Sequence, residues 1–455
     1  MNSQDTNNLS KKYLSSFISL VFCLFLPPMI AETKPYIVPP PPDMLEQRIE
    51  LVEPEGSLSL AEALSLALLH NPTLQEFAWE IRINDVKTLR AGLLPNPELG
   101  FEAENFLGSG QKRDFDQTET TVSISQLFEL GGKRAKREAL AMTERDLALW
   151  DYETRRLDII YQVAARYIKV VANQARLNLA VETTDVAEEI FNTVVARVKA
   201  GKVSPLEQSK SRVELAKARL NKARILRELV SNKQNLAAVW GSMKPIFKEV
   251  SGDLFAVQAV PEFSDLLTRL NNNPDLARWS AEIEGYRNAI ALAKAQKIPN
   301  ITFMAGGRHF ADNDDFAAVA GISAPLFIFD NKQTGVDEAQ MVLTQAMQKQ
   351  QAAKVAIRSL LIDNYQRLQM SLTEITALRD EVLPSARAAF KAVKVAYRLG
   401  EVGSLDLLDA QRTLFRSGSE HLEALAVFQL NVAKIERLIG GVLNPSSEKT
   451  SETIQ

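Results

Sequence analysis

The chain has 455 residues, of which 53 are basic and 56 are acidic, which gives a net charge of −3. This balance excludes the strongly basic surface that is typical of proteins that bind nucleic acid. The length alone suggests about three ordinary domains.

Residues 1–31 are typical of a secretory signal peptide. Lys11 and Lys12 precede an apolar run at 17–26, which is too short to cross a bilayer as a helix. We expect cleavage after Ala31. The only cysteine, Cys23, lies inside this run and is not preceded by the small residues of a lipoprotein signal, so the processed chain is expected to carry no thiol.

Residues 32–56 are expected to form a proline-rich tether, because the sequence PYIVPPPP at 35–42 favours an extended polyproline conformation. The pattern Ser59 to Glu62 predicts a capping box, which starts a helix that runs to His70. A second helix is expected at about 74–94.

The next segments alternate with a period of two, which predicts strands at about 97–107 and 119–128 around a polar loop. Leu99, Phe101 and Ala103 alternate with Glu102 and Glu104. Since no later segment predicts a transmembrane helix, strands are the expected way for this chain to enter a membrane. Glu102 and Glu104 would then face a wet lumen, and the apolar residues would face lipid.

Residues 133–200 contain neither proline nor glycine, so they predict a single helix of about 100 Å. Gly201 ends this helix, and a return helix is expected at 205–240. The return helix shows a seven-residue repeat, with Val213 and Leu220 at one expected core position and an alanine-rich set at the other. Such heptads predict closely packed coiled-coil helices.

The pattern then repeats, which indicates an internal duplication. The first structural repeat spans 57–240, with its hairpin tip at about 201–205, and an irregular equatorial connection spans 241–261. The second repeat spans 262–440, with strands at about 300–310 and 316–327, a long helix at 332–399 and a hairpin tip at about 400–404. Asn273-Pro274 repeats Asn71-Pro72, and residues 441–455 are expected to be a disordered tail. In each repeat we expect the short helix to stack end to end with the return helix.

Four strands cannot close a barrel, because even small closed barrels need about eight. An open sheet with an apolar outer face would leave unpaired edges, which hydrocarbon does not tolerate. Three copies of the chain would supply twelve strands, and these would form a tunnel.

Several motifs resemble the outer-membrane efflux proteins of the TolC family over about residues 57–440. They are PNPEL at 95–99, SQLFELGGKR at 125–134, its counterpart SAPLFIFDNK at 323–332, and VGSLDLLDAQ at 402–411. The sequence FELGGKR at 128–134 is more similar to the branch that works with heavy-metal exporters of the cobalt-zinc-cadmium type than to the drug-efflux branch. The resemblance implies a mainly α fold with membrane strands: a homotrimer in which a twelve-stranded β-barrel in the outer membrane joins a periplasmic α-helical barrel.

The same resemblance implies the partners. A channel of this kind in a Gram-negative bacterium would join a periplasmic membrane-fusion adaptor to an inner-membrane pump of the resistance-nodulation-division type. It would conduct its substrate passively, with heavy-metal cations as the expected substrate, and no catalysis or cofactor is expected. The three histidines share no ligand spacing, so no metal site is expected either.

Asp406 and Asp409 match the positions where this family places inward-facing aspartates near the periplasmic entrance. Their spacing of three puts both on one helix face, and rings of negative charge in an oligomer would favour cations. Glu207 is a weaker counterpart in the first repeat. The alternative is that the aspartates are solvated charges at a helix start, where acidic residues are stabilising in any case.

In the family reading the two tips dock the adaptor, whereas an ordinary turn between helices would also explain their glycines. The expected docking residues are Gly201, Val203, Leu206, Gly400, Val402, Gly403 and Leu405.

Two other readings of the whole chain stay open on the sequence. An efflux channel for drugs or organic solutes, or a type I secretion outlet, would have the same fold. A periplasmic coiled-coil scaffold without a pore is more distant, since it would need neither two hairpins nor two amphipathic strand pairs.

Overall fold

The computed structural model describes residues 52–444. The expected signal peptide, most of the expected tether and residues 445–455 of the expected tail lie outside these residues. Residues 441–444, which the expected disordered tail included, are described, and Leu443 is fully buried. Within the described part, no helix is long and apolar enough to cross a membrane.

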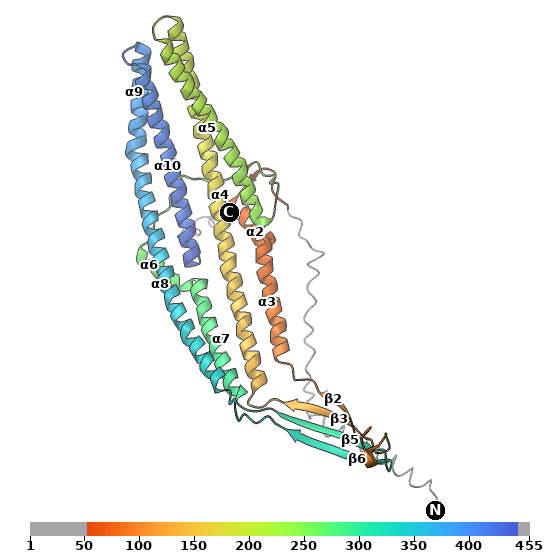
Figure 1. Ribbon diagram of the computed structural model, residues 1–455. Helices are drawn as coiled ribbons and strands as arrows, with labels where there is room; N and C mark the ends of the chain where they lie inside the picture. Colours follow the sequence, from red (N-terminus) through yellow and green to blue (C-terminus); the bar gives the residue numbers. More distant parts are fainter. Residues whose placement is uncertain (1–51, 445–455) are drawn as a thin grey trace, which may run out of the picture. The chain divides into compact units, whose positions relative to one another are not determined.

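The described residues form two successive sets of helices and strands (Figure 1). The first set comprises β1 (Ser57–Leu58), α2 (Leu60–His70), α3 (Pro72–Ala91), β2 (Glu98–Glu104), η1 (Gly110–Lys112), β3 (Glu119–Phe128), α4 (Lys133–Lys199), α5 (Pro205–Ala237) and η2 (Ala238–Trp240). The second comprises β4 (Glu249–Val250), α6 (Phe263–Arg269), η3 (Leu270–Asn272), α7 (Pro274–Gln296), β5 (Ile301–Phe310), β6 (Asp315–Ser323), α8 (Gln333–Ala377), η4 (Leu378–Val382), α9 (Leu383–Leu399) and α10 (Ser404–Ile439).

The long helix α4 is the element against which most others pack. Both α3 and α5 lie along it, with α3 next to the strands and α5 next to the hairpin tip (Figure 1). In the second set, α7 lies along α8 near the strands, and α10 returns along α9 and α8. The end-to-end stacking expected from the helix lengths is therefore observed in both sets.

Two equivalent asparagines join the stacked helices. The side-chain oxygen of Asn71 accepts a hydrogen bond from the amide of Leu74 and caps α3, while its side-chain nitrogen donates to the carbonyl of Val239 at the end of the return helix. Asn273 does the same in the second set: it caps α7 and donates to the carbonyl of Leu438, at 2.7 Å. The duplication thus extends to individual hydrogen bonds.

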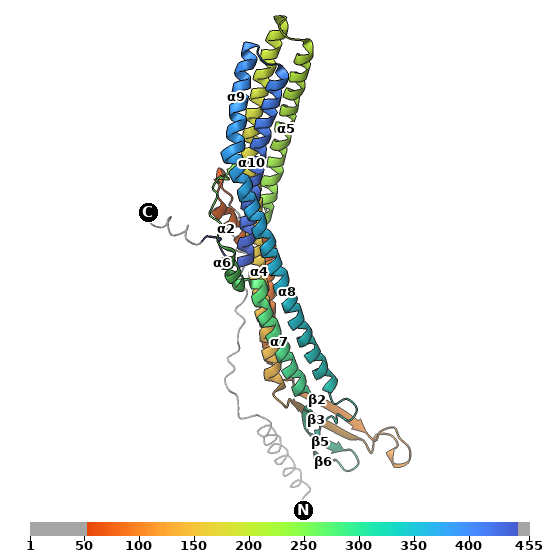
Figure 2. The same ribbon diagram turned by 90° about the vertical axis from the view of Figure 1, so that its left-hand side faces the viewer.

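The four longer strands form one antiparallel sheet in the order β2-β3-β5-β6 (Figure 2). β3 and β5 pair over the full length of both strands, from Glu119 opposite Phe310 to Phe128 opposite Ile301. The first and last strands of this sheet each have one edge without a partner in the described chain.

The fourth strand ends earlier than expected. The expected range was 316–327, but β6 ends at Ser323. Pro325 lies two residues further on and has no backbone N–H to donate to a strand ladder, which explains the early end.

The second long helix is not the uninterrupted helix that its length suggested. Its regular α-helical turns are broken at Leu378–Val382, where a π-helical turn separates α8 from α9 and the amide of Leu383 donates to the carbonyl of Leu378. Pro384 follows directly. Proline cannot donate the hydrogen bond to the residue four positions earlier, and its ring would collide with that carbonyl in a regular helix. The wider turn relieves this conflict.

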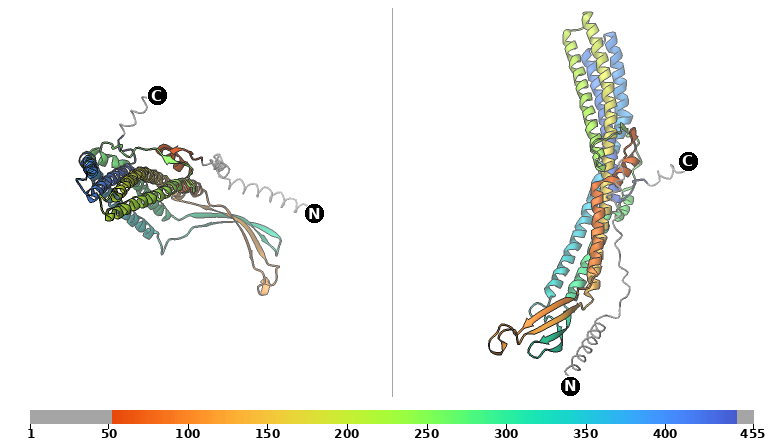
Figure 3. Two further views of the ribbon diagram at one scale, coloured as in Figure 1. Left: turned by 90° about the horizontal axis from the view of Figure 1, so that it is seen from above. Right: turned by 90° about the vertical axis from the view of Figure 1, so that its right-hand side faces the viewer.

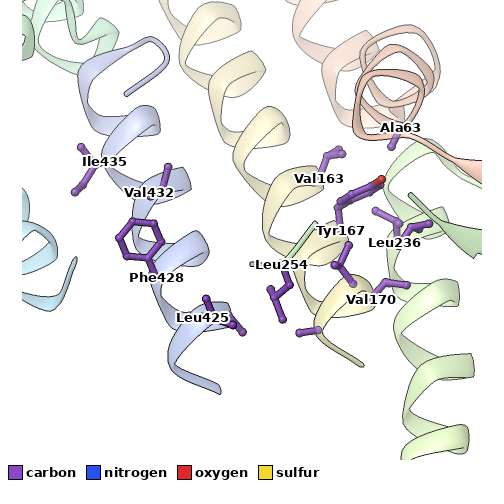
Figure 4. Close-up of a cluster of buried hydrophobic side chains, with 14 of the residues drawn as sticks. Ala63, Val163, Tyr167, Val170, Leu236, Leu254, Leu425, Phe428, Val432 and Ile435 are labelled. Carbon is purple, nitrogen blue, oxygen red and sulfur yellow. The ribbon is translucent and has the colours of Figure 1, made fainter. Parts of the chain in front are cut away.

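The main hydrophobic core lies where the two sets meet (Figure 4). Val163, Tyr167 and Val170 of α4 face α2 and α5, and Phe428 lies fully buried on α10. The small parallel sheet of β1 and β4 is held here as well, because the hydroxyl of Tyr167 donates to the carbonyl of Leu58 at 3.0 Å.

The heptad prediction for α5 is wrong for the contacts within one chain. Val213 and Leu220, the expected core residues, are 51% and 74% exposed. The buried residues of α5 are Ser211, Leu215, Ile225, Leu229, Leu236 and Ala237. The stripe that carries Val213 and Leu220 therefore faces away from α4.

Candidate functional site at the hairpin tips

The two helical hairpins end on the same side of the molecule, away from the sheet (Figures 1 and 3). α4 ends at Lys199, and Gly201 adopts a φ of +68°, a conformation that glycine tolerates without strain. α9 ends at Leu399, and Gly400 adopts a φ of +85°. Gly403 has a different role, because it has a φ of −83° and is the N-cap residue of α10.

A small apolar cluster holds the two tips together. Ile190 and Val194 of α4 pack with Tyr397 of α9 and with Leu407 and Leu408 of α10. All of these side chains are buried, and burial of apolar surface is the main favourable term for such packing. The tips therefore form one joint structure.

Polar contacts tie α4 to α9 around this cluster. The Arg197 guanidinium donates to the carbonyl of Tyr397 at 2.6 Å and lies 4.5 Å from the centre of its ring. The Glu189 carboxylate accepts from Lys394 at 2.7 Å and from Arg398 at 3.1 Å. These bonds, that from Lys394 first, hold the pKa of Glu189 below its usual value.

Two buried polar atoms beside this cluster have no hydrogen-bond partner within the described chain. They are the hydroxyl oxygen of Tyr397 and the Oε2 atom of Glu207 on α5. Burial is the main cause that raises the pKa of Tyr397, and the charge of Glu207 raises it further. Buried polar groups without partners cost free energy, so the hydrogen-bonding capacity of these two atoms is not satisfied within one chain.

The two aspartates of the expected gate are exposed and lie on the first turns of α10. The Asp406 carboxylate accepts a hydrogen bond from the amide of Gly403 at 3.0 Å, so it caps the helix. The hydrogen bond to Glu214 is the main cause that raises the pKa of Arg412, and the charge of Asp409, one turn further along α10 than Asp406, raises it further. Arg412 in turn donates to Glu214 of α5 at 2.6 Å. Within one chain, Asp406 and Asp409 are thus exposed to solvent, while the nearby Arg412 connects α10 to α5.

The expected docking residues fall into two groups. Leu206 and Leu405 are 61% and 60% exposed, and Gly201, Gly400 and Gly403 are exposed as well. Val203 and Val402 are half-buried, and Val402 packs against the apolar cluster of the tips. The two leucines are therefore the accessible apolar side chains among these residues.

At the other end of the helices, the two faces of the sheet have different chemistry. Leu99 and Phe101 are more than 70% exposed on one face. Glu102 and Glu104 lie on the opposite face, as their alternation predicted. On that face Arg308 donates to Glu119 at 2.7 Å and forms an ion pair with Glu104 at 3.1 Å.

No group of three or more histidine, cysteine or acidic side chains in residues 52–444 could hold a metal ion.

A family model for outer membrane efflux proteins matches residues 63–242 and 268–441. The chain is also 32% identical over 388 residues to the cobalt-zinc-cadmium resistance protein CzcC of Cupriavidus metallidurans, which covers 85% of this chain and 91% of CzcC. The chain belongs to the outer membrane efflux protein family. The two matched segments of this efflux protein correspond to its two sets of helices and strands.

Two further likenesses agree with this assignment. The efflux protein is 26% identical over 292 residues to the nickel-cobalt-cadmium resistance protein NccC of Alcaligenes xylosoxydans xylosoxydans, with 62% of this chain and 65% of NccC covered. A crystal structure of CusC superposes on it with a TM-score of 0.72 at 18% identity, covering 84% of this chain and 92% of CusC. The fold is therefore that of the TolC-like channels, as the motifs predicted.

Tyr397 is the residue of the efflux protein's tip that sequence reasoning missed. It lies three residues before Gly400 in a stretch rich in alanine, valine and lysine, and a lone aromatic side chain so close to a tip is a usable signal for a buried contact. Arg197 lies near the C-terminus of α4, where a cation is stabilising in any case, and the structure gives it a specific partner in Tyr397.

Proposed function

We propose that this protein is the outer-membrane channel of a tripartite efflux system and that it passively conducts heavy-metal cations to the exterior. The observation that carries the channel assignment is the sheet, which has one exposed apolar face, one polar face and two unpaired edges. The metal preference is supported by the likeness to CzcC and NccC. A conduit does not need to bind its cargo tightly, because strong binding would retain what must leave.

The proposed assembly is a homotrimer. The free edges of β2 and β6 would pair between copies and close a twelve-stranded barrel, so that no edge faces lipid. Leu99 and Phe101 would then contact the outer-membrane lipid, and Glu102 and Glu104 would line the lumen. Val213 and Leu220, which are exposed on α5, give a helical surface for the neighbouring copy.

We place the periplasmic gate at Asp406 and Asp409. Both carboxylates are exposed next to the tip, so three copies would form rings of negative charge at a constriction. Such rings would bind multivalent cations and, through neighbouring polar contacts, would hold the entrance closed. Replacing both aspartates with alanine is expected to raise single-channel conductance or to weaken block by multivalent cations in planar bilayers.

The matched control for this experiment is Glu420→Ala, which removes an exposed carboxylate further along the same helix. Circular dichroism would check that the double variant keeps its helices despite the lost cap at Asp406. Unchanged conductance together with unchanged block would exclude the gate assignment.

The proposed adaptor-docking surface consists of Leu206 and Leu405 with the glycines around them. Exposed leucines beside small residues allow another helical hairpin to approach closely. Replacing both leucines with aspartate is expected to reduce co-purification of the periplasmic membrane-fusion adaptor by tenfold or more, and with it coupling to a resistance-nodulation-division pump. Val230→Asp, on the exposed side of α5 far from the tip, is the control. If the unmodified chain, the double leucine variant and Val230→Asp all co-purify the adaptor equally, the proposed docking surface is wrong.

A further inference from the structure

The connection between β6 and α8, residues 324–332, exposes an unusual amount of apolar surface. Leu326 is 80% exposed, Ile328 72% and Phe329 fully exposed. These residues directly follow the strand, so they lie at the helix-side margin of the sheet. An exposed apolar group of this kind indicates an interaction surface.

A cavity of about 390 Å³ lies beside this connection, at the start of α4 and α8 and the end of α7. Its lining includes the cations Lys133, Arg137 and Lys332 but only one carboxylate, Glu129. Arg137 neutralises that carboxylate with two hydrogen bonds, at 2.6 Å and 3.1 Å. Asp330, next to the lining, pairs with Lys332 in the same way, so one positive charge is left in excess.

The two lysines have donors available for a ligand. Lys133 donates to the carbonyl of Ile298 at 2.5 Å and to the side chain of Asn300, which uses two of its three N–H groups. Lys332 bonds the carboxylate of Asp330, which uses one of its three. The amide side chains of Gln296 and Asn300 add further polar groups to the lining.

Two helices begin at this cavity. α4 has no side-chain cap at its N-terminus, whereas the first amide of α8, that of Gln333, donates to the side chain of Asn331 at 3.0 Å. The partial positive charge of the α4 end therefore adds to that of the lysines, and the combination favours a ligand with a negative charge.

We propose that this cavity binds the headgroup phosphate of an anionic phospholipid from the periplasm-facing leaflet of the outer membrane. The lipid's acyl chains would lie against Ile328 and Phe329. An amphipathic ligand fits because cations and an apolar segment adjoin at the margin of the sheet, where headgroups meet hydrocarbon. The inference rests on the proposed placement of the sheet in the membrane. The test of the lipid site measures binding and not transport, so a failure of the lipid proposal can be distinguished from a failure of the proposed channel function.

The test is native mass spectrometry of the full chain in a nonionic detergent, titrated with dioctanoyl phosphatidylglycerol. Dioctanoyl phosphatidylcholine and inorganic phosphate are separate arms. We expect phosphatidylglycerol to bind and the other two probes to bind at least tenfold more weakly. Lys332→Gln is expected to weaken phosphatidylglycerol binding about fivefold, because one lysine near an anionic lipid surface contributes about that factor to the affinity.

Lys244→Gln, in the equatorial connection, is the charge-matched control and should bind as the unmodified chain does. Phe329→Ser tests the apolar part and should also weaken binding. Neither Lys332 nor Phe329 is buried, so both variants are expected to fold. Equal binding of phosphatidylcholine or of phosphate alone, or unchanged affinity in Lys332→Gln, would overturn the proposal.

Discussion

The Asp406 carboxylate accepts a hydrogen bond from the amide of Gly403, so this residue caps α10 whatever else it does. Helix capping and a gate role are compatible, because the bond uses one lone pair of one oxygen and leaves the rest of the carboxylate exposed. Asp409 has no such capping role at its position in the helix. A single change at Asp409 therefore reports on charge more cleanly than a change at Asp406, which also removes the hydrogen bond from the Gly403 amide.

Glu214 gives a pH dependence that can be tested at a single residue. Its pKa is lowered, first by the hydrogen bond from Arg412 and then by Lys217. The folded protein thus binds fewer protons here than the unfolded chain does. The contribution to stability is fully present above the unfolded pKa of about 4.3 and is lost as the pH falls through the lower folded value.

We therefore expect the melting temperature of the unmodified protein to fall more steeply between about pH 5 and pH 3 than that of Glu214→Gln, since glutamine does not titrate. Thermal unfolding followed by circular dichroism would measure both curves. Parallel curves would show that the bond between Glu214 and Arg412 does not contribute to stability.

At the scale of elements, the asparagine-proline pairs explain why the duplication was readable from the sequence. Asn71 and Asn273 each cap a helix and bond the carbonyl at the end of a return helix, so each has two structural reasons to be asparagine. Proline at the next position has a fixed φ that suits the first helical turn. Such local requirements fix the residue type at both positions, so the repeat can be recognised in the sequence.

Alternation and capping likewise predicted β3 and the first turn of α2 correctly. Ser59 and Glu62 form the expected capping box, with bonds of 2.8 Å and 3.2 Å. The π-helical turn was missed because Pro384 lies inside a strongly helical stretch, and a helix accommodates one proline by widening a turn before it. The exposed side of α5 was misread because a heptad pattern shows that a seam exists, but not which neighbour it faces.

For the site, local rules predicted the tips but not the contacts between them. The glycines at 201 and 400 are visible as helix breakers. The packing of Arg197 on Tyr397 joins residues that are 200 positions apart, and no local pattern encodes such a partner.

At the scale of the whole molecule, the exposed residues Val213 and Leu220 on α5 predict a contact between copies of the chain. A charged residue at Leu220, which is 74% exposed in one chain, should be harmless to the monomer but should be buried in a trimer. Leu220→Glu is therefore expected to shift the protein from three chains to one, measured by light scattering in detergent. Lys222→Glu, two positions further on and on another side of the helix, is the control. A trimer that survives Leu220→Glu would place the contact elsewhere.

The π-helical turn at Leu378–Val382 also breaks the symmetry of the duplication. α4 and the arm from Gln333 to Leu399 run over matching residues, yet a π-helical turn takes up an extra residue with little added rise. The second arm is thus shorter than α4 by about 1.5 Å, and its residues beyond the turn are rotated by about 100° relative to their duplicates. Residues that are paired by counting along the two arms are therefore equivalent in position, but near the tips their side chains point in different directions. The two arms of the duplication therefore differ in length and in the direction of the side chains beyond the π-helical turn.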